Sequence, residues 1–201
     1  MGLPASKVHN YSPEEYFAIS EEAESRYEYE HGRILDMGTT SEPHNDLVFN
    51  LTRLLKDATA GKGCKVHFET IRLEVEEAGK YYLPDVMLTC DAKDHQDYQT
   101  KRYPLLVIEV LSESSEIRDR GEKFHAYLRL PSLQYYVLVS QDKLKVELFA
   151  KMETGGWAYN MFDRNQDIIS LGKSGVELSV SDIYQDVTLV TYASSPKLDE
   201  K

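Results

Sequence analysis

Residues 105–111 read Leu-Leu-Val-Ile-Glu-Val-Leu, six apolar side chains with a single acid, Glu109, among them. A run that is apolar at both odd and even positions is typical of a strand buried on both faces, in the interior of a sheet. A lone ionised carboxylate is costly to bury, so it is normally paired, protonated or bound to a metal ion. Glu109 is therefore the first candidate for a functional residue.

A second acid, Asp85, opens the strand-like run at residues 83–88, and beyond both strands Asp119 and Lys123 share the face of an expected helix. Carboxylates on rigid strands suit Mg²⁺, which takes few protein ligands and keeps several waters. We expect Asp85, Glu109 and the main-chain carbonyl of Val110 to bind Mg²⁺, with Mn²⁺ as a substitute. A nearby Lys123 ammonium would orient water and offset developing negative charge, so the pattern predicts phosphodiester hydrolysis.

Part of this pattern also has a purely structural interpretation. Pro84-Asp85 is compatible with a simple strand start, and Asp119 with Lys123 is compatible with a surface ion pair worth ~0.3–0.5 kcal/mol. Glu109 is harder to explain in this way, because an ionisable residue inside an apolar strand usually has a functional role.

The composition indicates an ordinary globular chain. Its 201 residues fit one domain, 1–201, with a core at about 13–185 and loose ends at 1–11 and 194–201. The formal net charge of −11 argues against a broad basic nucleic-acid-binding face, although a local patch remains compatible with it.

Cysteine usage and hydropathy predict a cytoplasmic location. The two cysteines, Cys64 and Cys90, lack metal-finger spacing, and we expect them to be free thiols in a reducing compartment. There is no signal-peptide pattern, and no apolar run approaches the ~20 residues of a membrane span.

Periodicity and turn signals predict a mixed α/β fold, a mixed sheet flanked by helices. Ser12 and Glu15 form a capping box with proline at the first helical position, so a helix begins at Pro13. The expected helices then cover 43–58, 119–130 and 180–184. The expected strands are a hairpin at 26–30 and 33–38, followed by 66–76, 81–89, 104–111, 134–140, 144–150, 157–162 and 167–171.

Taken together, several short motifs resemble the Uma-two family of endonucleases, in the PD-(D/E)XK restriction-endonuclease-like superfamily. The likeness runs from about residue 13 to 185. The residues that carry it are Tyr27-Glu28, Gly32, Ser41, His44, Pro84-Asp85, Ile108-Glu109-Val110-Leu111-Ser112, Asp119-Arg120-Gly121-Glu122-Lys123 and Tyr127.

The resemblance implies a restriction-endonuclease-like core with Mg²⁺ at the edge of the sheet. Asp85 and Glu109 match the two acids of the superfamily motif. The motif's lysine is absent at position 111, where Leu111 stands, and Lys123 on the following helix matches it instead. Glu28 matches an N-terminal acid that can approach the metal. The catalytic set is then Asp85, Glu109, Lys123 and Glu28, acting on nucleic acid, with DNA the expected substrate.

Other interpretations stay open at this level. The acidic balance and Leu111 are compatible with a catalytically inactive module that binds nucleic acid or a protein partner. A two-carboxylate hydrolase of another substrate, such as a glycoside, is a third alternative. Strand edges in the second half leave a homodimer open. We expect His44 to be a capping or solvated histidine, Glu28 most simply to lie on the polar face of its strand, and Tyr127 to pack in the core with its hydroxyl near the site.

Overall fold

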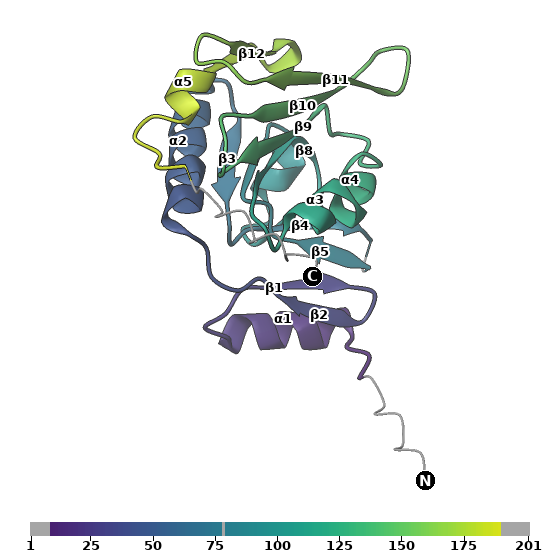
Figure 1. The fold of residues 1–201 in the computed structure, drawn as a ribbon. Helices are drawn as coiled ribbons and strands as arrows, with labels where there is room; N and C mark the ends of the chain where they lie inside the picture. Colours follow the sequence, from purple (N-terminus) through teal and green to yellow (C-terminus); the bar gives the residue numbers. More distant parts are fainter. Residues whose placement is uncertain (1–8, 78, 190–201) are drawn as a thin grey trace, which may run out of the picture.

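The computed structural model describes residues 9–77 and 79–189, and it confirms a mixed α/β architecture (Figure 1). The larger sheet has six strands in the order β11-β10-β9-β8-β6-β3. Its members are β3 (Lys65–Phe68), β6 (Val86–Thr89), β8 (Pro104–Leu111), β9 (Tyr135–Ser140), β10 (Val146–Lys151) and β11 (Trp157–Phe162). The strand predicted from the apolar run, β8, lies inside this sheet, antiparallel to β6 and parallel to β9.

Helices cover both faces of the six-stranded sheet (Figure 1). The apolar stripe of α2 (Glu42–Ala58) packs on one face together with α5 (Val180–Ile183). On the other face, the crossover between β8 and β9 contains α3 (Glu116–Arg120) and α4 (Glu122–Tyr127). Side chains alternate along β8, so Ile108 faces α2 whereas Val107 faces α4.

The second sheet was not anticipated by the sequence patterns. It has five strands in the order β2-β1-β5-β4-β7. They are β1 (Tyr27–Glu30), β2 (Arg33–Asp36), β4 (Arg72–Glu76), β5 (Lys80–Tyr82) and β7 (Thr100–Lys101). Helix α1 (Pro13–Glu22), which begins with the predicted capping box, packs on this sheet through Tyr16, against Tyr29 and Tyr81.

Two segments that were predicted as single strands are each divided into two strands in the structure. The segment 66–76 divides into β3 of the larger sheet and β4 of the smaller one, and 81–89 divides likewise into β5 and β6. The first break lies at Glu69, which has a positive φ of 53° and donates its N–H to the carbonyl of Pro84 at 3.1 Å. The chain therefore leaves the larger sheet after β3 and returns to it at Asp85.

The predicted helix 119–130 is also wrong as a single helix, because it is interrupted at Gly121. A Cβ atom at this position would lie 2.9 Å from the carbonyl oxygen of Ile117, a separation that real Cβ atoms do not adopt. The strand predicted at 167–171 is β12 (Ile168–Leu171), and it pairs with an unpredicted strand, β13 (Val176–Ser179). Short 3₁₀ turns lie at Ala92–His95 and Gly172–Ser174.

The expectation of free thiols is wrong in the structure, where Cys64 and Cys90 form a disulfide. These cysteines directly flank β3 and β6, which pair antiparallel with Lys65 opposite Thr89, so the fold brings them together although 26 residues separate them. The compartment argument could not detect this proximity, because it used no information on strand pairing.

The expected loose end at 1–11 needs a correction at its inner limit. The Tyr11 N–H donates to the carbonyl of Gly32 at 2.9 Å, and the Tyr11 carbonyl accepts from the Tyr29 hydroxyl at 2.9 Å. Residues 1–8 and the expected loose end 194–201 lie outside the described residues. Across residues 9–77 and 79–189, every helix is too short or too polar to cross a bilayer.

Candidate active site

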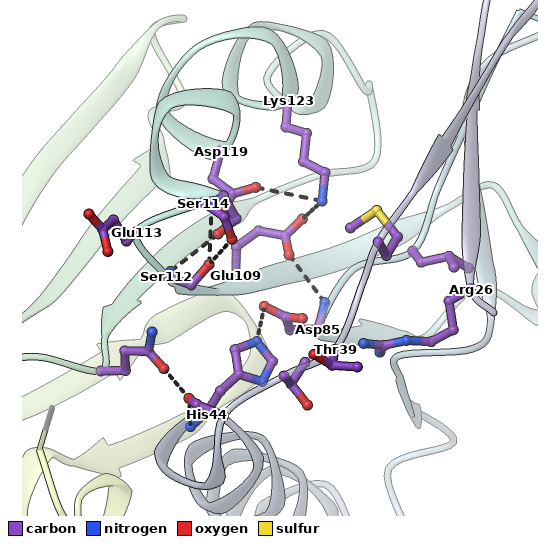
Figure 2. Close-up of a pocket in the computed structure, with 16 residues that line it drawn as sticks. Arg26, Thr39, His44, Asp85, Glu109, Ser112, Glu113, Ser114, Asp119 and Lys123 are labelled. Carbon is purple, nitrogen blue, oxygen red and sulfur yellow. Dashed lines mark hydrogen bonds and ion pairs between the residues drawn. The ribbon is translucent and has the colours of Figure 1, made fainter.

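The two predicted acids meet at one end of the six-stranded sheet, where β6 begins beside β8. Val86 pairs with Ile108, which brings Asp85 next to Glu109 and Val110. The Asp85 N–H donates to Glu109 Oε2 at 3.2 Å, and the Val110 N–H donates to Asp85 Oδ2 at 2.7 Å. The acids are thus joined through each other's backbone, with both side chains directed toward a shared pocket (Figure 2).

Lys123 reaches the same place from α4 and is almost completely buried. Its Nζ lies 3.1 Å from Glu109 Oε1 and 3.6 Å from Asp119 Oδ1 (Figure 2). Behind them, Glu28 Oε1 lies 3.0 Å from the same nitrogen. The structure therefore brings the helical lysine to the strand acid, as its predicted role requires. Because Leu111 packs in the apolar cluster beneath α4, position 111 contributes no charge to this site.

Glu28 lies behind Lys123 rather than on the polar face of its strand, which corrects the simplest prediction for this residue. It is fully buried, it accepts the Leu83 N–H at 2.8 Å through Oε1, and its Oε2 pairs with Arg118. It does not line the pocket formed by the other acids. The structure thus brings Glu28 into contact with Lys123, where its two oxygens are already engaged by protein donors.

Tyr127 packs in the core as expected, and its hydroxyl donates to Glu109 Oε1 at 2.8 Å. Together with Lys123, this bond fixes one oxygen of Glu109 from the α4 side. Glu109 Oε2, which accepts only the longer bond from Asp85, and Asp85 Oδ1 are then the oxygens least engaged by the described residues.

The site holds more acids than bases. Four nearly buried carboxylates, those of Glu28, Asp85, Glu109 and Asp119, surround the cations of Lys123 and Arg118. Burial raises the pKa of Glu109 well above its ordinary value, and Lys123 offsets this only in part. Burial likewise raises the pKa of Asp119. An opposite charge placed beside these acids would favour their ionised forms.

Asp85 and Lys123 keep their charges. Burial pushes the pKa of Asp85 upward, but the contact with His44, the charge of Lys123 and the Val110 N–H together outweigh it and lower the pKa. Burial pushes the pKa of Lys123 down, yet the surrounding carboxylates raise it well above the usual value. Lys123 is therefore an ammonium at neutral pH and cannot act as a base there.

The pocket above these residues has a volume of about 380 Å³. Its wall carries polar side chains from four loops, among them Arg26, Thr39, Ser112 and Ser114, which Figure 2 labels, and also Gln141. In the part of the chain that the structure describes, no three His, Cys, Asp or Glu side chains are grouped as a complete metal cage. This donor set fits Mg²⁺, which takes one or two carboxylates and keeps several waters, better than a metal that needs a full set of protein ligands.

His44 was wrongly expected to be a capping or solvated histidine. It is 5% exposed, and its Nε2 lies 3.2 Å from Asp85 Oδ2. The sequence did contain a signal, because His44 lies three residues before Leu47 and seven before Leu51, on the buried stripe of α2. Asp119, which the motif included but the predicted catalytic set did not, also lines the pocket.

This fold, with its paired carboxylates and buried lysine, is that of a nuclease-like α/β protein. The chain belongs to the Uma2 (Uma-two) family, whose model, described as “Putative restriction endonuclease”, matches residues 13–181. The fold and the family match both confirm the resemblance predicted from the motifs.

Two cyanobacterial relatives support the assignment over most of the chain. The “Uncharacterized protein slr1290” of Synechocystis sp. is 34% identical over 182 residues, which cover 90% of this chain and 95% of that protein. The “Uncharacterized protein sll1609” of the same organism is 32% identical over 145 residues, 71% of this chain and 82% of the relative.

A solved structure supports the fold. It is the crystal structure of “a putative nuclease belonging to DUF820” from Anabaena variabilis, with a TM-score of 0.71 and 15% sequence identity. The match covers 87% of this chain and 97% of the Anabaena chain. The arrangement of helices and strands is therefore shared even where the sequences have diverged.

Proposed function

We propose that this protein is a Mg²⁺-dependent endonuclease that hydrolyses phosphodiester bonds in nucleic acid, with DNA as the favoured substrate. The observation that carries the proposal is the convergence of Asp85, Glu109 and Lys123 at one pocket. Membership of the Uma2 family supports the same class of reaction.

The metal would be held by Asp85, Glu109 and the carbonyl of Val110. The N–H and C=O groups of one residue in an extended strand point to the same side, and the Val110 N–H points to Asp85. Mg²⁺, or Mn²⁺ in its place, would supply Lewis-acid stabilisation of the phosphate and lower the pKa of a bound water. The excess of buried carboxylates over cations supports this assignment.

The chain's own groups would complete the chemistry. The Lys123 ammonium, held between Glu109 and Glu28, would orient the attacking water and stabilise the charge that develops on the phosphate. Glu28 and Arg118 would keep Lys123 in place from behind. The hydroxyl groups of Ser112, Ser114 and Thr39 on the pocket wall are suited to contact phosphate oxygens.

Plasmid nicking in the presence of Mg²⁺ is the direct test. We expect Asp85→Ala and Glu109→Ala each to lower the rate about 100-fold or more, since each removes a group that acts on the transition state. Glu177→Gln, an exposed acid on β13, is the matched control and should cleave at the wild-type rate. Equal nicking by wild type and both alanine variants would reject the assignment.

The alternative is a nuclease fold that binds nucleic acid or a protein partner without cleaving. The net charge of −11 favours the protein partner, because electrostatic attraction to a polyanion is weak for such a chain. Mn²⁺ binding without cleavage of any DNA or RNA would support this alternative over the endonuclease.

A further inference from the structure

His44 occupies a position for which neither the motif nor the family description supplies a role. It lines the pocket, and it contacts Asp85 from α2, on the opposite face of the sheet from Lys123 (Figure 2). We propose that His44 is a positioning residue that holds the Asp85 carboxylate with Oδ1 toward the pocket. The part of this proposal that concerns metal binding and cleavage rests on the proposed function.

The contacts of Asp85 define what His44 would hold. Asp85 Oδ2 accepts the Val110 N–H at 2.7 Å and lies 3.2 Å from His44 Nε2, so two donors from different elements fix the same oxygen. Within the described residues, Oδ1 has no such donor. A carboxylate restrained at one oxygen presents the other in a single direction, which is how outer partners commonly orient a metal-binding acid.

The ring of His44 is itself held firmly. The Ser41 side chain caps α2 by accepting the His44 N–H at 3.3 Å, and the Ser41 hydroxyl donates to Gln141 Oε1 at 2.6 Å. Leu47 and Leu51 anchor the same helix face in the core. The position of Nε2 is therefore set by the sheet-packed helix and by the turn after β9.

The second nitrogen supports a functional interpretation. Nδ1 of His44 is buried and has no hydrogen-bond partner among the described residues. A histidine kept only for packing would be expected to satisfy both nitrogens or to be replaced by an apolar residue. Among the residues that the structure describes, the contact through Nε2 is the polar interaction of this ring, and it is directed to a predicted metal ligand.

The two acids are then held from opposite faces of the sheet. Helix α4 fixes Glu109 Oε1 through Lys123 and Tyr127, whereas α2 fixes Asp85 Oδ2 through His44. Each acid is left with one less engaged oxygen. Small shifts of either helix against the sheet would therefore alter the separation of these two less engaged oxygens, Glu109 Oε2 and Asp85 Oδ1.

The first test needs no metal. Urea unfolding of His44→Phe, Asp85→Asn and the double variant, all in EDTA, measures whether the two side chains interact. We expect the double variant to shift the unfolding midpoint by clearly less or more than the two single shifts added together. Additive shifts would overturn the proposal, whether or not the protein cleaves nucleic acid.

The second test uses Mn²⁺ alone as the probe. We expect His44→Phe to weaken Mn²⁺ binding about tenfold or more, as the loss of an orienting partner commonly does. His44→Gln keeps an N–H donor near the Nε2 position and should restore binding to within about threefold of wild type. Asn50→Ala is the control, because this buried α2 side chain donates to the carbonyls of Ile183 and Gln185 and does not line the pocket. It should destabilise the protein and leave Mn²⁺ binding unchanged.

The outcomes separate the two proposals. Unchanged Mn²⁺ affinity in His44→Phe, beside a measurable wild-type affinity, would overturn the positioning role. A wild type that binds no Mn²⁺ would reject the proposed metal-dependent function, and the metal-free coupling would then decide alone whether His44 holds Asp85. In an active protein, His44→Phe should lower kcat while the KM for DNA stays nearly constant, because His44 acts through Asp85 and not on the substrate.

Discussion

For Glu109, the proposed catalytic role and the stability of the fold make opposing demands. Burial raises the pKa of Glu109 well above its ordinary value, Lys123 offsets this only in part, and the nearby acids raise the pKa further. We predict that Glu109→Gln stabilises the metal-free protein at neutral pH by roughly 0.5–2 kcal/mol, as removal of a strained functional group commonly does, while cleavage is lost. Chemical unfolding in EDTA, paired with plasmid nicking, checks both parts.

The raised pKa of Glu109 also predicts how the stability difference between wild type and Glu109→Gln changes with pH. A carboxyl with a raised pKa binds its proton more tightly when folded, so wild-type stability falls as the pH rises above the unfolded value near 4.5. The stability advantage of Glu109→Gln should therefore be small below that value and grow toward neutral pH. An advantage that shrinks over the same range would show that Glu109 is stabilised as a carboxylate by Lys123.

The sequence was most informative at this scale where a residue broke its local pattern. Glu109 stood out because it interrupts an apolar strand, and the structure brings it to Asp85 and Lys123. His44 did not stand out, although its spacing from Leu47 placed it on the buried face. Its contact with Asp85 depends on how α2 packs against the sheet, and helical periodicity does not specify this packing.

At the scale of elements, α3 and α4 form a bent pair that presents Lys123. The bend lies at Gly121, where an added Cβ would meet the Ile117 carbonyl oxygen at 2.9 Å. We predict that Gly121→Ala destabilises the protein by about 1–3 kcal/mol, the usual range for overpacking, and lowers nicking because Lys123 shifts with α4. Gly172→Ala, which adds a Cβ in open space, is the matched control.

Thermal unfolding and nicking rates of the two variants would check this. A Gly121→Ala protein as stable and active as Gly172→Ala would show that the crossover relaxes without cost. The single helix predicted at 119–130 missed the bend because its core-facing residues, such as Phe124 and Tyr127, all lie after Gly121, so the apolar pattern does not report on the turn before it. A single glycine in a helical pattern does not by itself predict a break in the helix. The close approach of the Ile117 carbonyl oxygen to Gly121 is visible only in the structure.

Helix α3 is tied to the sheet by Arg120, which pairs with Glu147 on β10. Burial raises the pKa of Glu147, but hydrogen bonds from Arg120, Lys145 and Tyr159 outweigh it and lower the pKa to about 2. A depressed pKa contributes stability above the unfolded value of 4.5 that is lost as the pH falls toward about 2. We predict that Glu147→Gln costs roughly 1–3 kcal/mol at neutral pH.

Urea unfolding of Glu147→Gln between neutral pH and acid would measure that difference. The gap to wild type should stay constant down to about pH 5 and close below it as Glu147 is protonated. A gap that is independent of pH would assign the loss to packing rather than to charge. Glu177→Gln on the exposed face of β13 should show no gap at any pH.

At the scale of the molecule, the fold depends on one excursion of the chain. After β3 the chain crosses to the smaller sheet, forms β4 and β5, and returns as β6 with Asp85 at the point of re-entry. The sequence predicted the fold class, the order of most elements and the family. It did not reveal the two sheets, because the apolar patterns do not specify which sheet each half of 66–76 and 81–89 joins. Pro84 was the local sign of a boundary, and Glu69, with its positive φ, was not.

The disulfide between Cys64 and Cys90 closes this excursion at its base. Cross-linking a loop of this length removes conformational entropy from the unfolded chain, so the double substitution Cys64→Ser with Cys90→Ser should destabilise the protein by about 3 kcal/mol. Dithiothreitol should produce a similar loss in wild type and none in the double variant, as measured by urea unfolding. Two titratable thiols in unreduced, unfolded wild type would contradict the cross-link. The segment between the two cysteines places Asp85 beside Glu109. Reduction of the disulfide should therefore also raise the Mn²⁺ concentration that nicking requires. An unchanged Mn²⁺ requirement would show that the disulfide only stabilises the pairing of β3 with β6.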